Sequence, residues 1–336
     1  WRRADGLLDA FFANRHALDD RWTYFRAGEL KMDIDFELGR LTADAIRRQI
    51  GQLREFNDSG EELRRIVASR EFYGGPGMIS LENPDIAGLK ESVQELLAKC
   101  HYMLGRVAGR GRRWDEAVAA YDAVLDRYGR FDLYASRSLY QKGLIYLTAM
   151  NRVDRAVDLF IDLFRRYDGS GLADQAMEDL RDAERVAARP SEVAVWLKAC
   201  RRMFRVSDDR DLSRFAAHLA MVLAERHVGK DDRYTRDREV IAALTDGLAW
   251  LTAPKDTARI GADDIARANL LLARAYRLES DLRPASIRHR YGVTYPEANV
   301  RKENACYSRV MSIDASAAAF DEAQWRMAVN LALTGS

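Results

Sequence analysis

The sequence predicts an all-α protein built as an α-solenoid of stacked antiparallel helical hairpins. Three observations carry this prediction. Apolar residues recur with the 3.6-residue period of an amphipathic helix along most of the 336 residues. Only 6 prolines interrupt the chain, which is few for a strand-rich fold with many turns. One hairpin pattern is followed by a second copy with the same small and aromatic positions, which indicates a repeat array.

The composition places limits on the class of protein. Hydrophobic residues make up 48% and charged residues 31% of the chain, which is typical of a globular protein. The 53 basic and 52 acidic residues give a formal net charge of +1. A charge so close to zero does not favour nonspecific binding to nucleic acid, so no nucleic-acid partner is expected.

The cysteines and the apolar segments give no sign of a disulfide framework or a membrane span. Cys100, Cys200 and Cys306 are scattered and none lies in a CxxC pair, so we expect buried thiols. No apolar run is long enough to cross a membrane. The chain begins at Trp1 rather than Met, so we expect that a segment preceded it, and membrane anchoring by that segment stays open.

Residues 1–85 are expected to form an N-terminal helical capping region. The turn-rich segment YGGPGMISLENP, residues 73–84, interrupts the helical pattern there, and we expect it to be a hinge or a junction to the array that follows. The apolar stripes of this region are Leu7, Phe11 and Leu18, then Ile46, Ile50 and Leu53, and then Leu63, Ile66 and Val67.

The clearest hairpin lies just after this region. An apolar stripe over residues 93–107 is followed by a second over residues 117–128. We expect Gly109 and Gly111 to supply the backbone freedom for the turn between the two helices. The segment GRVAGRGRR also has the composition of a phosphate-binding loop. Acidic residues follow its arginines at once, however, so we interpret it as a connector with solvated charge.

The same pattern returns in the stretch LYQKGLIYLTAMNRVDRAVDLFIDLFRRYDG. The two alanines are 39 residues apart, and the second repeat carries one extra residue between its glycine and its alanine. Small residues let the paired helices approach closely, and we expect the aromatic residue to fill the space between neighbouring hairpins. The corresponding positions are Gly105 and Gly143, Ala117 and Ala156, and Tyr121 and Phe160.

These two repeats resemble the tetratricopeptide repeat (TPR) family, most clearly over residues 92–168. The resemblance rests on LGRVAGRGRRWDEAVAAY and KGLIYLTAMNRVDRAVDLF, which match the family's glycine, alanine and aromatic positions. It implies a right-handed superhelix whose concave side, lined by the first helix of each hairpin, binds partner segments. The chain departs from the family pattern at His101, Leu139, Lys142, Gly129 and Asp168.

The rest of residues 86–336 is expected to continue the array with five to seven stacked hairpins. One of its helices is expected to begin after Pro190 with Ser191 as its cap. A long inserted loop near residues 280–297 exceeds the usual helix–helix connection. We expect this loop to contact a partner chain through Arg288, Tyr291 and Tyr295, or alternatively to cover the last hairpins.

Known catalytic and metal-binding motifs are missing. The sequence has no GxSxG, no GxxxxGK[ST] and no HExxH. His218 and His227 share one predicted helix but are too far apart to bind one ion together. Acidic pairs such as Asp263 and Asp264 precede helices, where they oppose the helix dipole. We therefore expect no catalytic residue, no metal and no cofactor, although residues distant in sequence could still form a site in space.

The resemblance implies a partner-binding surface on the first helix of each repeat. Lys99, Tyr102 and Arg106 would come from the first repeat, and Arg137 and Tyr140 from the second. Cations alternating with aromatic rings suit an acidic or partly apolar segment of another protein chain. These side chains could equally be solvated faces.

The leading functional hypothesis is a noncatalytic scaffold or adaptor that mediates protein–protein interaction in a multiprotein assembly. The start at Trp1, and a similarity of RRYDGSGLADQAMEDL to TPR proteins of the cell envelope, favour a periplasmic or membrane-associated bacterial envelope location slightly over the cytoplasm. The alternative is a helical-repeat enzyme, or a carbohydrate- or RNA-binding protein, with its site in the concave groove.

Overall fold

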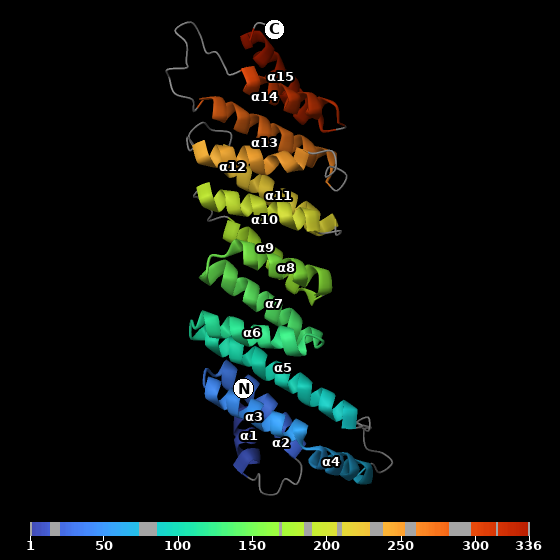
Figure 1. Ribbon diagram of the computed structural model, residues 1–336. Helices are drawn as coiled ribbons and strands as arrows, with labels where there is room; N and C mark the ends of the chain where they lie inside the picture. Colours follow the sequence, from blue (N-terminus) through green and yellow to red (C-terminus); the bar gives the residue numbers. More distant parts are fainter. Residues whose placement is uncertain are drawn as a thin grey trace. The chain divides into compact units, whose positions relative to one another are not determined.

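The computed structural model describes residues 2–13, 21–73, 86–167, 170–184, 190–206, 210–228, 238–252, 260–281, 297–313 and 315–334. Helices joined by turns make up these ranges, and no strand occurs within them, which confirms the all-α prediction. The chain separates into two compact units, Trp1–Ile145 and Tyr146–Ser336, which we call the N-terminal and C-terminal units. Figure 1 shows successive helices lying side by side within each unit, as expected for stacked helical hairpins.

The N-terminal unit joins the expected capping region to the first repeat. A boundary at residue 85 is not where the chain divides, because α3 of the capping region packs along α5 of the repeat. The helix α6 packs on α5 and on α7. The helices of this unit are α1 (Arg2–Ala13), α2 (Arg21–Glu37), α3 (Ala43–Asp58), α4 (Gly60–Tyr73), α5 (Ile86–Arg110), α6 (Trp114–Tyr128) and α7 (Asp132–Leu144).

The turn between α5 and α6 lies where the sequence placed it, but its left-handed residue is an arginine. Arg112 has a φ of 55°, whereas neither Gly109 nor Gly111 has a positive φ. The N–H of Arg113 donates to the carbonyl of Ala108 at 2.9 Å, and the N–H of Arg112 donates to that of Gly109 at 3.0 Å. This pair of hydrogen bonds is the Schellman motif that ends many helices. The expectation that the glycines supply the turn was therefore wrong.

The second repeat keeps this turn and accommodates its extra residue in a π-helical segment. Asn151 has a φ of 50°, and it follows Arg112 at the same 39-residue interval that separates the two repeat alanines. The π-helix η2 (Ile145–Ala149) precedes it, and the N–H of Arg152 reaches the carbonyl of Tyr146 at 2.7 Å. A π-bulge is the usual way in which a helix absorbs one inserted residue.

The close approach of paired helices is confirmed in the first repeat. A Cβ atom added to Gly105 would lie 2.5 Å from Cε1 of Tyr121, so the tyrosine ring rests directly on the backbone of α5. The ring therefore fills space inside its own hairpin, rather than the space between neighbouring hairpins that we expected. Both repeat alanines, Ala117 and Ala156, are completely buried.

The C-terminal unit is also built of helices packed side by side. Its α10 packs on α8, α11 and α12, and α13 packs along α14. A Cβ atom on Gly247 would lie 2.5 Å from Cδ1 of Leu197, so α12 and α10 also touch through a glycine. The helices are α8 (Val153–Tyr167), α9 (Leu172–Glu184), α10 (Pro190–Val206), α11 (Arg210–Val228), α12 (Arg238–Leu248), the 3-10 helix η4 (Ala249–Thr252), α13 (Ala262–Asp281), α14 (Glu297–Met311) and α15 (Ala317–Thr334).

In this unit the start of α10 differs from the sequence expectation, whereas the helices that flank the inserted loop agree with it. Pro190 is the first residue of α10, so Ser191 lies inside the first turn and is not the cap. The helices flanking the inserted loop end at Asp281 and begin at Glu297, as expected. Arg288, Tyr291 and Tyr295 lie outside the described residues, as do residues 74–84 of the turn-rich segment.

The burial of the cysteines agrees with the expectation from the sequence. All three thiols are buried and free, and burial raises the pKa of Cys100 and of Cys306 to about 12. Across the described part of the chain, no helix combines the length and the apolar character that a membrane crossing requires.

Candidate functional site

The surface expected on α5 is largely covered by α2. The Nζ atom of Lys99 donates to Oδ2 of Asp33 at 2.6 Å and to Oε1 of Glu29 at 3.1 Å. Its side chain is 11% exposed, because two carboxylates of α2 and the packed helices surround it. The expectation that Lys99 is displayed to a partner chain is therefore corrected. Its charge is balanced within the chain.

The aromatic and arginine positions of that surface are also held internally. Tyr102 is buried, with its ring 6.1 Å from that of Tyr134 on α7. The guanidinium carbon of Arg106 lies 3.8 Å from the centre of the Phe36 ring on α2, a cation–π contact. Tyr140 is buried as well.

Only Arg137 is exposed among the five expected positions on α5 and α7. Cations and rings at these positions were expected to receive an acidic, partly apolar segment. In the structure that segment is α2 itself, which supplies Glu29, Asp33 and Phe36. The side chains that contact Lys99 and Arg106 therefore come from the same chain.

A better candidate is an open groove between α3, α5 and α6, which we call the His101 groove. Its volume is about 340 Å³. Alanines of α6 form its floor, and Ala119 is exposed in it. The residues that line the groove are Arg47, His101, Leu104, Ala108, Glu116, Ala119, Ala120, Ala123 and Arg127.

The groove is therefore a shallow site of about 340 Å³, large enough for one or two side chains of a bound segment. Its polar groups come from three helices, with Arg47 on α3, His101 on α5 and Glu116 and Arg127 on α6. Glu116 is paired with Arg113 at 3.1 Å and lies 3.7 Å from Arg47. The positive charge of Arg47 is thus partly balanced at one end of the groove.

The other end of the groove carries a net positive charge around His101. Nη2 of Arg54 lies 3.4 Å from Nε2 of His101, and the imidazole ring stacks on Tyr128 with the ring centres 5.6 Å apart. Burial, together with the charges of Arg54 and Arg127, lowers the pKa of His101 to about 4. The imidazole is therefore neutral near pH 7, and it accepts a hydrogen bond from Arg54.

The two arginines beside His101 are available to a ligand. Both side chains belong to exposed residues. In the part of the chain that the structure describes, neither Arg54 nor Arg127 forms an ion pair with a carboxylate. A carboxylate entering the groove would meet Arg127, which lines it, next to a neutral His101 ring that Arg54 contacts and beside alanine side chains. Such a setting suits an acidic side chain flanked by apolar ones.

A second cavity of about 490 Å³ lies in the C-terminal unit between η2, α8, α9 and α10. Its walls are mainly apolar, and Val195 is 41% exposed at its edge. Glu192 is its one charged residue among those that the structure describes. The lining residues are Leu147, Thr148, Asn151, Val153, Ala183, Ser191, Glu192, Val195 and Trp196. The cavity offers contact to an apolar side chain but no arrangement of groups typical of catalysis.

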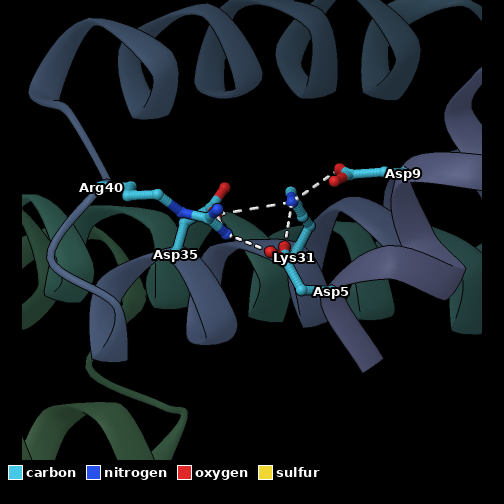
Figure 2. Close-up of polar contacts among 5 residues, drawn as sticks. All are labelled: Asp5, Asp9, Lys31, Asp35 and Arg40. Carbon is cyan, nitrogen blue, oxygen red and sulfur yellow. Dashed lines mark hydrogen bonds and ion pairs between the residues drawn. The ribbon is translucent and has the colours of Figure 1, made fainter. Parts of the chain in front are cut away.

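A charged cluster joins α1 to α2 and to the turn before α3 (Figure 2). Lys31 contacts Asp5 and donates to Asp9 at 2.8 Å, while Arg40 donates to Asp5 at 2.6 Å and to Asp35 at 2.8 Å. The hydrogen bonds from Arg40 and Lys31 lower the pKa of Asp5. Each charge has an opposite partner, so the cluster holds helices together rather than presenting a reactive group.

No group of three metal-ligating side chains is found within the described ranges. His218 and His227 do share α11, as the sequence predicted.

Arg54 and Arg127 were not predicted as site residues from the sequence, because they come from helices on either side of α5. One signal was present, since His101 stands where the repeat pattern usually has a large apolar residue.

Comparison with known proteins supports the repeat assignment locally. Residues 99–129 match the family model of the tetratricopeptide repeat. This segment contains the C-terminal part of α5 from residue 99 on, the turn with Arg112 and all of α6, so it lies within the first repeat. No curated protein and no solved structure is significantly similar to the chain.

Proposed function

We propose that the protein is a noncatalytic scaffold that binds an acidic, partly apolar segment of another protein chain in the His101 groove. The TPR match supports the general class, because such repeats generally bind other proteins. One observation supports the location of the site. Arg54 and Arg127 converge on a buried, neutral His101 beside an alanine floor.

The proposed contact combines an ion pair with the burial of apolar side chains. A carboxylate of the partner pairs with the two guanidinium groups, which gives orientation and a faster encounter. Apolar side chains of the partner lie on Ala119 and Ala123 of α6. The surface at Lys99 is left out of the proposal, because α2 already supplies its carboxylates.

A photocrosslinking residue at Ala119 tests the proposal. This position is exposed and lies in the groove, so a bound chain should be captured there and identified by mass spectrometry. Arg54→Glu together with Arg127→Glu should abolish the capture. Arg137→Glu is the matched control, since this exposed arginine lies on α7 outside the groove. Equal capture by the double variant and the control would contradict the proposed site.

A binding assay distinguishes the other function classes. Thermal stabilisation by oligosaccharide or by RNA, with no protein partner captured, would favour a carbohydrate- or RNA-binding protein. We extend the proposal to a bacterial envelope location, which is the expectation drawn from the segment RRYDGSGLADQAMEDL in the sequence analysis. Fractionation of cells that express the protein tests this part separately, and recovery in the cytoplasm alone would count against it.

A further inference from the structure

The helix α2 borders a cavity on the side that is turned away from α5. Its Glu29 and Asp33 contact α5. Tyr24, Gly28 and Asp35 are spaced by four and seven residues, so they lie on a different side of α2, where they line a cavity of about 440 Å³. Side chains of α1 and α3 complete this cavity, which we call the α1–α3 cavity. Small-molecule sites usually have volumes of about 300–1,000 Å³, so the cavity has the size of such a site.

The wall of the α1–α3 cavity on α1 and α2 is largely aromatic and apolar. The ring centre of Phe12 lies 5.2 Å from that of Tyr24, which lies 6.1 Å from that of Phe25. These three residues and Met32 all border the cavity. Because the rings contact one another, they form a preformed surface for an apolar group.

The wall on α3 is polar. Arg48, Gln49 and Gln52 all border the cavity, and their spacing by three and four residues places them on one side of the helix. The buried residues Ile46 and Ile50 lie on another side of α3. An aromatic wall opposite a few hydrogen-bonding side chains is typical of a site that both holds and orients a small ligand.

Two of the polar groups on α3 have no partner in the protein. Nε2 of Gln49 packs against Gly28, where a Cβ atom would lie 3.1 Å from it, and this buried atom has no hydrogen-bond partner among the described residues. A buried amide without a partner destabilises the fold, so such a group in a native protein requires an explanation. Arg48 is exposed, and its guanidinium forms no ion pair within the described ranges.

The other charges at the cavity are already balanced. Lys31 and Asp35 border it, but both belong to the charged cluster that joins α1 to α2 (Figure 2). Among the described residues that line the cavity, Arg48 is therefore the cation that remains for a ligand. The charge left over favours an anion.

We propose that the α1–α3 cavity binds a small organic carboxylate with an aromatic body. The carboxylate pairs with Arg48, and the ring lies against Tyr24 and Met32. The amide of Gln49 donates to the carboxylate once it has turned towards the cavity, because the last side-chain torsion of glutamine is soft. This site is separate from the proposed function, since none of the residues that line the cavity lines the His101 groove.

Calorimetric titration of the full chain with phenylpropionate tests the ligand class. Two reference compounds divide the ligand into its parts, because phenylpropanol lacks the carboxylate and propionate lacks the ring. We expect saturable binding of phenylpropionate, and at least about 10-fold weaker binding of each reference compound. No saturable binding of phenylpropionate would overturn the proposal, and so would equal binding of phenylpropionate and phenylpropanol.

Substitutions on α3 test the location of the site. Arg48→Gln should weaken phenylpropionate binding at least about 10-fold. Arg65→Gln on α4 is the matched control, since Arg65 is likewise exposed and free of ion pairs in the described part of the chain, but does not border the cavity. Equal effects of the two substitutions would overturn the assignment to this cavity.

The role of Gln49 is tested through binding and stability together. Gln49→Leu should weaken phenylpropionate binding without lowering the melting temperature of the free chain, because it removes an unpaired buried amide and keeps a similar volume. A variant with a lower melting temperature and unchanged phenylpropionate binding would show that the amide serves the fold, which would overturn its role as a ligand group.

Discussion

At the scale of single residues, a glycine decides how closely α5 and α6 pack, because it has no side chain. The ring of Tyr121 lies on the backbone of α5 because Gly105 has no Cβ atom. Gly109 belongs to the same helix, and a Cβ atom there would meet nothing within 4 Å. The two glycines look alike in the sequence, but only the first is required by packing.

We expect Gly105→Ala to lower the free energy of unfolding by about 1–3 kcal/mol, because the new methyl group overlaps the Tyr121 ring. Gly109→Ala is the matched control, and it should raise stability by up to about 1 kcal/mol, since alanine loses less backbone entropy in a helix. Chemical denaturation of both variants makes the comparison. Equal effects of the two substitutions would show that the Tyr121 contact does not limit the packing.

His101 should make stability depend on pH. Its pKa is lowered from 6.5 to about 4 in the folded state, so the unfolded chain binds the proton first as the pH falls. The stability that this group contributes is fully present above pH 6.5 and is lost between pH 6.5 and about 4. We expect His101→Gln to flatten the fall of the melting temperature over this window. Parallel curves for the two proteins would contradict a lowered pKa at His101.

At the scale of elements, α2 is the helix that the sequence did not predict. Its buried side chains lie on more than one side of the helix, so it lacks the single apolar stripe that marked the other helices. It contacts α3 through Phe25 and Phe56, with ring centres 5.2 Å apart, and it contacts α5 through Lys99. Because α2 was missing from the prediction, the residues it covers were expected to be exposed.

The pairing of α2 with α5 predicts a loss of stability when its central charge is reversed. Lys99→Glu would place a third carboxylate beside Glu29 and Asp33 in a site that is largely shielded from water. We expect a loss of about 3 kcal/mol or more. Arg137→Glu changes an exposed side chain and should alter stability by less than about 0.5 kcal/mol. Thermal unfolding of both variants decides, and a stable Lys99→Glu protein would mean that α2 does not depend on this pairing.

At the scale of the whole molecule, apolar periodicity predicted the helices but not their arrangement in space. The all-α class, the first hairpin and the position of the second turn followed from apolar spacing and from the glycine and alanine positions. The division at residue 145 did not, because it depends on contacts between helices distant in sequence. The candidate site could not be predicted for the same reason. Arg54 and Arg127 come close to His101 only when α3 and α6 pack on α5.

Because the chain forms two compact units, we expect a packing defect in one unit to lower the free energy of unfolding independently of a defect in the other. Gly247→Ala places a methyl group 2.5 Å from Leu197 in the C-terminal unit, as Gly105→Ala does against Tyr121 in the N-terminal unit. Each single variant should lose about 1–3 kcal/mol. Because the two sites share no neighbours, the losses should add within about 0.5 kcal/mol in the double variant. Urea denaturation of the four proteins measures this sum. A coupling energy above about 1 kcal/mol would mean that the chain unfolds with one shared core rather than with two.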